Sequence, residues 1–170
     1  MKIQAQTYNR FVNQHQLIKS YIDNLSPDAI NNKLSPEKRS IHETVAFICR
    51  YQYIFLDRLN RMLNETTPSF KKYNAVADEE YHAYACRSTG ALLHELYRVR
   101  DEIKILINQL DTHQCARTGI HEKKGKMNVS EWLDFFLLQE SKHLYKIFKM
   151  AGSYLKTIEN NKSKNPLLKV

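Results

Sequence analysis

Glycine and proline are scarce in this sequence, with four of each among 170 residues. Because both residues interrupt helices, their scarcity indicates long helices with few breaks. The sequence also has no apolar run of membrane-spanning length, and residues 1–7 contain no apolar segment of the kind found in signal peptides. We therefore expect a cytoplasmic protein that does not cross a membrane.

Cysteine is scarce as well. The three cysteines, Cys49, Cys86 and Cys115, lie far apart and form no CxxC pair. This spacing argues against a disulfide framework and against a structural zinc site, so we expect free, reduced thiols. The sequence contains no HExxH motif, glycine-rich phosphate loop or recognisable Ser/His/Asp or Cys/His arrangement. We accordingly expect no catalytic residues.

The net charge is +8, which raises the question of an anionic partner. The basic residues are scattered, and no basic run is interleaved with aromatic residues on one face. We interpret them as a solvated surface and do not expect nucleic-acid binding. The alternative, binding to an anionic polymer, would require an affinity that falls steeply with salt.

Apolar residues recur in steps of three and four along four segments, which is typical of amphipathic helices in a bundle. The first segment runs from Tyr8 to Leu25. The second is predicted to begin at Pro36 and carries a core stripe of Ile41, Val45, Ile48, Gln52, Phe55, Leu59 and Met62. The third begins at Asp78 and is expected to continue without a break from Tyr81 to Leu110.

The fourth helix is predicted to follow Asn128, which forms a variant capping box with Glu131. One row on this helix contains Trp132, Phe136, Gln139, His143, Ile147 and Met150. A second row widens the apolar face and contains Val129, Leu133, Leu137, Leu144, Phe148, Ala151 and Leu155. This apolar face is wider than one core needs, so we expect a homodimer.

These segments predict an all-α fold, a four-helix bundle in a single domain over residues 1–159, with no strand pattern. The connections over about 64–77 and 112–127 are long enough for a crossover, and the second is able to cover a pocket. Residues 160–170 are expected to form a frayed polar tail.

The seven histidines divide into two groups. Five fall outside the apolar stripes and are expected at the surface: His42, His82, His94, His113 and His121. His15 and His143 lie in the seams of the first and fourth helices, where a hydrogen-bonded core histidine is the favoured interpretation. Glu140, beside the seam, is expected to be exposed or to cap a helix.

Three segments in succession resemble the DinB/YfiT-like superfamily. They are Arg39 to Ile48, Pro68-Ser69-Phe70 with Tyr73, and His121 to Leu133 followed by His143-Leu144. The resemblance covers most of residues 5–155. It implies an up-down-down-up bundle that is often dimeric, and in many members a divalent metal held by three histidines.

In the pattern of that superfamily, the metal-ligand positions fall on Phe47, Gln139 and His143. Phenylalanine cannot coordinate a metal and an amide is a poor ligand for zinc or nickel, so we expect no metal cofactor and no catalysis. The predicted function is non-catalytic or small-ligand binding, in a cavity lined by His143, Gln139, Phe47, Trp132, Phe136 and His121 and filled partly by aromatic residues, Tyr51 among them.

The alternative is a divalent-metal-dependent enzyme, a thiol transferase or a hydrolase as the resemblance implies for active relatives. Its displaced site would be centred on His143, with His15 and His121 holding nickel or zinc weakly. No substrate can be read from the sequence.

Overall fold

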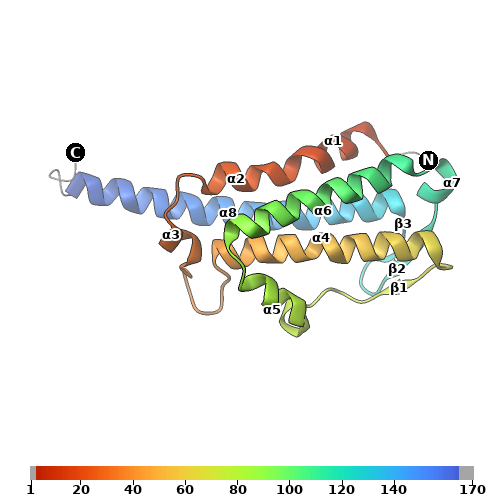
Figure 1. Ribbon diagram of the computed structural model, residues 1–170, viewed down its shortest axis with the longest axis horizontal. Coiled ribbons are helices and arrows are strands. Elements are labelled where there is room, and N and C mark those ends of the chain that lie inside the picture. The colour runs from red at the N-terminus through yellow and green to blue at the C-terminus, as the bar shows by residue number, and fades with distance from the viewer. Residues whose placement is uncertain (1–2, 165–170) are drawn as a thin grey trace.

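A computed structural model describes residues 3–164, with side chains as far as Thr157. Helix α1 (Ala5–Asn13), the 3₁₀ turn η1 (Gln14–Gln16) and α2 (Leu17–Ile22) together form the first long element; α4 (Ile41–Asn64), α6 (Thr89–Gln109) and α8 (Val129–Lys164) form the other three. Figure 1 shows α4 and α6 running in the direction opposite to α1–α2 and α8. The predicted four-helix bundle and its up-down-down-up order are therefore confirmed.

The second long helix begins later than predicted. It starts at Ile41 and not at Pro36, because Ser40 and Glu43 form a capping box. The Ser40 hydroxyl accepts a hydrogen bond from the Glu43 N–H at 3.1 Å, and the Glu43 carboxylate accepts one from the Ser40 N–H at 2.9 Å. The short helix α3 (Pro27–Asn31) precedes it, and residues 32–40 form a loop along the side of the bundle.

The third segment is not one continuous helix. It divides into α5 (Glu79–Ala85) and α6, which begins at Thr89 after the cap residue Ser88. His42, which was expected at the surface, is buried beside this break. Its ring nitrogens lie 2.8 Å from Thr89 Oγ1 and 2.9 Å from the Ala85 carbonyl oxygen, so the imidazole holds the two helix ends to α4.

The two long connections contain a small sheet that the sequence did not predict. Strand β1 (Ser69–Phe70) pairs in parallel with β2 (Thr118–His121), which pairs antiparallel with β3 (Gly125–Asn128). Strands this short carry too little alternation to be recognised. A side chain at Gly119 would place its Cβ 2.7 Å from Phe70 Cε2, so only glycine lets β2 approach this closely. The turns η2 (Ala75–Ala77) and α7 (Thr112–Cys115) complete the connections.

A buried ion pair lies in the centre of the bundle. Glu140 was expected to be exposed, but only 2% of its surface is accessible, because it pairs with the equally buried Arg100 of α6. Gln52 of α4 accepts from Arg100 Nε at 3.0 Å and donates to Glu140 at 3.1 Å. Arg100 also donates to the Phe11 carbonyl oxygen at 2.8 Å. This polar network therefore joins all four long elements of the bundle.

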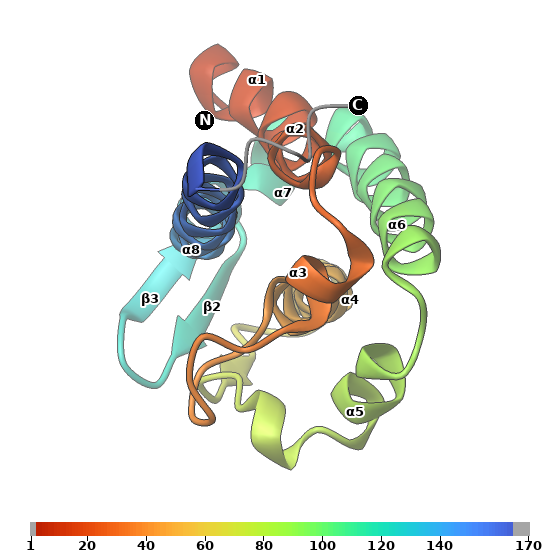
Figure 2. The ribbon, with the colours of Figure 1, turned by 90° about the vertical axis from the view of Figure 1, so that its left-hand side faces the viewer.

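The fourth helix begins as predicted, since Asn128 and Glu131 hydrogen-bond reciprocally at 3.0 and 2.7 Å. It continues as far as Lys164, beyond the predicted domain end at residue 159, and the rest of the predicted tail lies outside the described residues. Figure 2, an end view, shows α3 across the end of the bundle and α5 outside α4.

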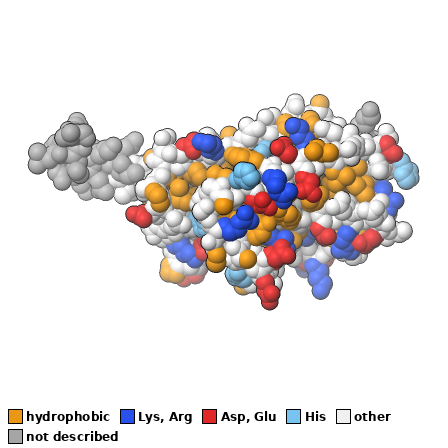
Figure 3. Space-filling model, in the orientation of Figure 1, with side chains coloured by type: hydrophobic (Ala, Val, Ile, Leu, Met, Phe, Trp, Pro, Cys, Tyr) orange, Lys and Arg blue, Asp and Glu red, His pale blue; other side chains and the backbone are white. Residues whose placement is uncertain are grey.

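The outer surface carries charges of both signs. On the face shown in Figure 3, Lys and Arg side chains are interspersed with Asp and Glu side chains and do not form one continuous patch. None of the helices within residues 3–164 combines the length and the apolar character needed to cross a bilayer.

Candidate functional site

A cavity of about 1120 Å³ lies along the side of the bundle. Its walls come from the loop over residues 33–39, the start of α4, η2, α5 and the middle of α8. Gln139 and His143, one helical turn apart on α8, line it together with Arg39 from the loop and Tyr81 from α5. The later start of α4 leaves residues 33–39 free to form this wall.

His143 lies at the inner side of this cavity and touches Phe47. Their ring centroids are 4.2 Å apart, so the structure brings together Phe47 and His143, with Gln139 on the same cavity wall. The Nδ1 atom of His143 is buried and has no hydrogen-bond partner. Burial, with contributions from Lys146, Arg39 and Lys142, lowers the pKa of His143 to about 4. The ring is therefore neutral at pH 7, and its Nδ1 is a buried polar atom without a partner.

The guanidinium of Arg39 covers the outer side of Phe47. Its central carbon lies 4.6 Å from the Phe47 centroid and 5.3 Å from the Tyr81 centroid, within the range of cation–π contacts. Arg39 Nε donates to the Tyr81 hydroxyl at 3.1 Å, and that hydroxyl donates to the Glu43 carbonyl oxygen at 3.3 Å. The sequence places Arg39 in a segment that resembles the superfamily but does not indicate a role in a site. Its position directly before the capping residue Ser40 was the signal that could have placed it here.

Below the cavity, aromatic rings fill the space between α4 and α8. Phe47 stacks on Tyr51 with centroids 5.8 Å apart, Tyr51 on Phe136 at 5.8 Å, and Phe136 on Phe55 at 4.3 Å. Phe136 is fully buried and does not line the cavity. The predicted site residues are thus divided between the cavity wall and the core beneath it.

Trp132 and His121 lie in a different part of the molecule, under the small sheet. The Trp132 indole donates to the Gly119 carbonyl oxygen at 3.4 Å, and its ring centroid is 5.7 Å from that of His121. His121 was expected at the surface but is buried, because β2 packs it against Trp132 and Phe135. Its Nδ1 accepts from the Lys123 N–H at 3.0 Å. Burial and the nearby Arg58 lower the pKa of His121.

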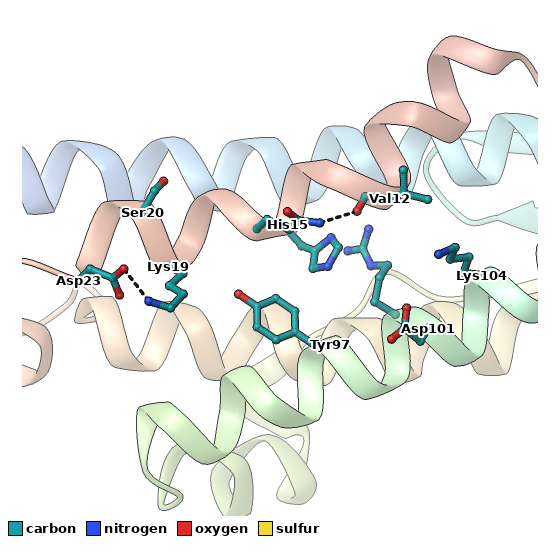
Figure 4. A pocket seen from close by; sticks show the side chains of 10 residues that line it. Val12, His15, Lys19, Ser20, Asp23, Tyr97, Asp101 and Lys104 are labelled. Atoms are coloured by element: carbon teal, nitrogen blue, oxygen red, sulfur yellow. Dashed lines mark hydrogen bonds and ion pairs between the residues drawn. The ribbon is translucent and has the colours of Figure 1, made fainter.

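A second, smaller pocket of about 540 Å³ surrounds His15, between the η1–α2 segment and α6 (Figure 4). The imidazole is only 5% exposed and packs edge-on against Tyr97, with ring centroids 5.4 Å apart. Its Nδ1 also has no partner, and burial together with Arg100 lowers the pKa of His15 to about 3. Here the charges are largely balanced, since Lys19 pairs with Asp23 at 2.6 Å and Arg100 with Glu140.

The residues present do not fit a metal ion of the kind the family resemblance implies. His143 supplies the one imidazole among the three ligand positions, and the Arg39 guanidinium beside it would repel a divalent cation. His15, His121 and His143 have separate neighbours: Tyr97, Trp132 and Phe47, respectively. Across residues 3–164, no three His, Cys, Asp or Glu side chains are grouped as metal ligands.

The cysteines do not supply an alternative nucleophile in the cavity. Cys49 and Cys115 are buried, Cys86 is exposed, and none of the three forms a disulfide within the described residues. Burial, followed by the charge of Glu95, raises the pKa of Cys49 to about 12. Because the thiolate is the reactive form, such a thiol is inert at neutral pH.

Comparison with known proteins connects this geometry to a family. The family described as the DinB superfamily matches residues 10–147. Among solved structures, the chain is similar to YfiT from Bacillus subtilis, described as a probable metal-dependent hydrolase with an unusual four-helix bundle topology. That match has a TM-score of 0.77 and 14% identity, and it covers 88% of this chain and 86% of YfiT. No curated protein matches the chain.

Proposed function

Because this chain belongs to the DinB superfamily, we propose that it is a cytoplasmic, small-ligand-binding member that works without a metal and without catalysis. The observation that carries the proposal is the contact between Phe47 and His143, with the guanidinium of Arg39 also against the ring of Phe47. The ring of Phe47 lies where a metal ion would need a donor atom, and the positive charge of Arg39 lies next to it. The free thiols support a reducing location.

The cavity supports binding for two reasons. It is open to solvent on one side, and its volume of about 1120 Å³ is sufficient for a small organic molecule. The neutral imidazole of His143 and the amide of Gln139 also line the cavity, which gives it polar groups next to its apolar walls. Catalysis is not supported, because the neutral His143 has no neighbouring carboxylate, thiol or hydroxyl that hydrogen-bonds to its Nδ1.

A metal-dependent enzyme is the second candidate. The likeness to YfiT, a probable metal-dependent hydrolase, favours it, as does the unpartnered nitrogen of His143. The low identity to YfiT and the loss of two ligand positions count against it.

Metal titration separates the two candidates. We expect purified protein to contain no stoichiometric zinc or nickel, and we expect added zinc or nickel to leave the melting temperature unchanged, since a metal that binds only the folded state must raise it. The control is His143→Ala. Tight binding that this substitution abolishes would establish the second candidate in place of the first.

A further inference from the structure

We infer that the cavity beside His143 binds a small organic anion through its carboxylate or phosphate group. This inference rests on the proposed ligand-binding function and adds the chemical class of the ligand. It begins from the charges around the cavity. Six basic side chains but only two acidic ones, Glu37 and Glu43, line it; the basic ones are Lys33, Lys38, Arg39, Lys142, Lys146 and Lys149.

Most of these positive charges have no partner. Lys33 pairs with Glu43 at 2.8 Å. In the part of the chain that the structure describes, no carboxylate lies within ion-pair distance of Arg39, Lys142 or Lys146. Positive charges that converge on a concave surface without counter-charges attract an anion, and the low-dielectric walls strengthen that attraction.

Arg39 is the best-placed of these groups. Its guanidinium is held in place by contacts with the rings of Phe47 and Tyr81 and by the Nε hydrogen bond to the Tyr81 hydroxyl. The two terminal nitrogens make no hydrogen bond to any described residue, which leaves them available as donors. Terminal nitrogens of this kind match the two oxygens of a carboxylate or phosphate, and bidentate bonds of this type are among the strongest in proteins.

The α8 wall complements Arg39. Lys142 and Lys146 are four residues apart, so both project from the face that carries His143 into the cavity. The neutral ring of His143 can donate one further hydrogen bond to an anionic oxygen. A ligand oxygen would thus meet donors from the loop and from α8 together.

Apolar side chains at the rim suggest the rest of the ligand. Tyr145 and Val76 are exposed there, and Met150 of α8 also lines the cavity. We therefore expect an anion attached to an apolar or aromatic body. The second pocket, around His15, provides a comparison, because two of its three basic residues, Lys19 and Arg100, already have carboxylate partners, and Lys104 is the third.

Isothermal titration with three benzene derivatives of similar shape tests the inference. Benzoate carries a carboxylate, benzamide is neutral and benzylamine is cationic; inorganic phosphate is the fourth probe, to separate carboxylate from phosphate recognition. We expect benzoate or phosphate to bind and to shift the NMR signals of the His143 ring. Benzamide and benzylamine should bind at least tenfold more weakly, since a hydrogen bond to a charged group contributes a factor of about ten or more.

Two variants locate the binding. Arg39→Gln should weaken benzoate or phosphate binding about tenfold or more. If Arg39→Gln does not fold, Lys142→Gln/Lys146→Gln, two substitutions on α8, serves the same purpose. The matched control is Lys123→Gln/Lys124→Gln, which removes the same charge from exposed positions on the β2–β3 hairpin and should bind as the unaltered protein does.

The possible outcomes are distinct. Loss of anion binding in the cavity variants, but not in the control, supports the inference. Anion binding that survives in both cavity variants, or falls equally in the control, overturns it. Equal binding of benzamide and benzoate, with His143 signals shifted by both, leaves the proposed function standing and overturns the anion class. If no probe binds or shifts His143, both the anion class and a small-ligand function are rejected.

Discussion

The imidazole of His143 lies against the ring of Phe47, with the two ring centroids 4.2 Å apart. The residues come from α8 and α4 and occupy two of the three positions at which the family resemblance implies metal ligands. A ring contact therefore joins the two helices at a point where relatives with the full histidine set would use a shared metal.

Restoring the two lost ligands should restore metal binding. In Phe47→His/Gln139→His, three imidazoles would come from the same two helices, so zinc or nickel should raise the melting temperature by several degrees, as expected for a ligand of the folded state. Thermal unfolding with and without metal measures this. Each single variant, with two histidines, is the control and should respond little. A double variant that ignores both metals would contradict the assignment of these positions.

The buried pair of Arg100 and Glu140 should behave differently from an exposed pair. Arg100→Met or Glu140→Gln alone should lower the free energy of unfolding by about 3–5 kcal/mol, because each leaves buried groups without partners. The double variant should lose much less than the sum. Urea unfolding measures all three. The exposed pair is the comparison: Lys19→Met should leave the free energy of unfolding nearly unchanged, because solvent screens that pair. Additive losses at Arg100 and Glu140 would show that they are not coupled.

His15 should make the protein less stable in acid. Its folded-state pKa of about 3 lies below the ordinary value of 6.5, so the unfolded chain takes up a proton first as the pH falls. The contribution of His15 is therefore fully present above pH 6.5 and is lost progressively toward pH 3. Between pH 7 and 5 the loss should be about 2 kcal/mol.

The test compares urea unfolding of His15→Gln with that of the unaltered protein at both pH values. Between pH 7 and 5, the free energy of unfolding should fall less in the variant than in the unaltered protein. His94→Gln, which removes an exposed histidine of α6, is the matched control. Equal slopes for the three proteins would mean that folding does not lower the pKa of His15.

The outer face of α8 is where the expected homodimer would form. Most residues of the second apolar row of α8 are buried in the core. Phe148 and Leu155 of that row remain 54% and 38% exposed, and Leu138 and Tyr145 of the same helix are also exposed. We expect Phe148→Glu to convert a dimer into a monomer, because it places a charge in an apolar contact. Light scattering at micromolar concentration measures the mass, with Ile105→Glu on α6 as the control. A monomeric mass for the unaltered protein would contradict the expectation.

The sequence predicted the helices and their buried faces, because these depend on patterns within one segment of the chain. The seven-residue stripe from Ile41 to Met62 is buried throughout, and the Asn128–Glu131 cap begins α8 as expected. The start of α4 was misplaced, although Ser40 and Glu43 have the spacing of a capping box. The sequence has two possible helix starts there, one at Pro36 and one after Ser40. A local pattern does not show which of the two tertiary packing selects.

The burial of individual polar residues and the charges of the cavity could not be predicted, because they depend on partners from distant segments of the chain. Glu140 and Arg100 each look like surface charges on their own helices, and they become a pair only because the bundle places α6 and α8 opposite each other across its core. His42 and His121 are buried for the same reason, since Thr89 and Trp132 approach them from elsewhere in the chain. The charges around the cavity come from the loop and from α8, which are about a hundred residues apart.

The capping box at the start of α4 has a consequence for recognition. Arg39 directly precedes the capping residue Ser40, so the backbone that carries the guanidinium is fixed by the reciprocal hydrogen bonds of Ser40 and Glu43. The conformational entropy of this segment is lost when the chain folds, so ordering the segment does not weaken ligand binding a second time. Ser40→Ala would therefore be expected to weaken an interaction made by its neighbour, although the serine itself touches no ligand.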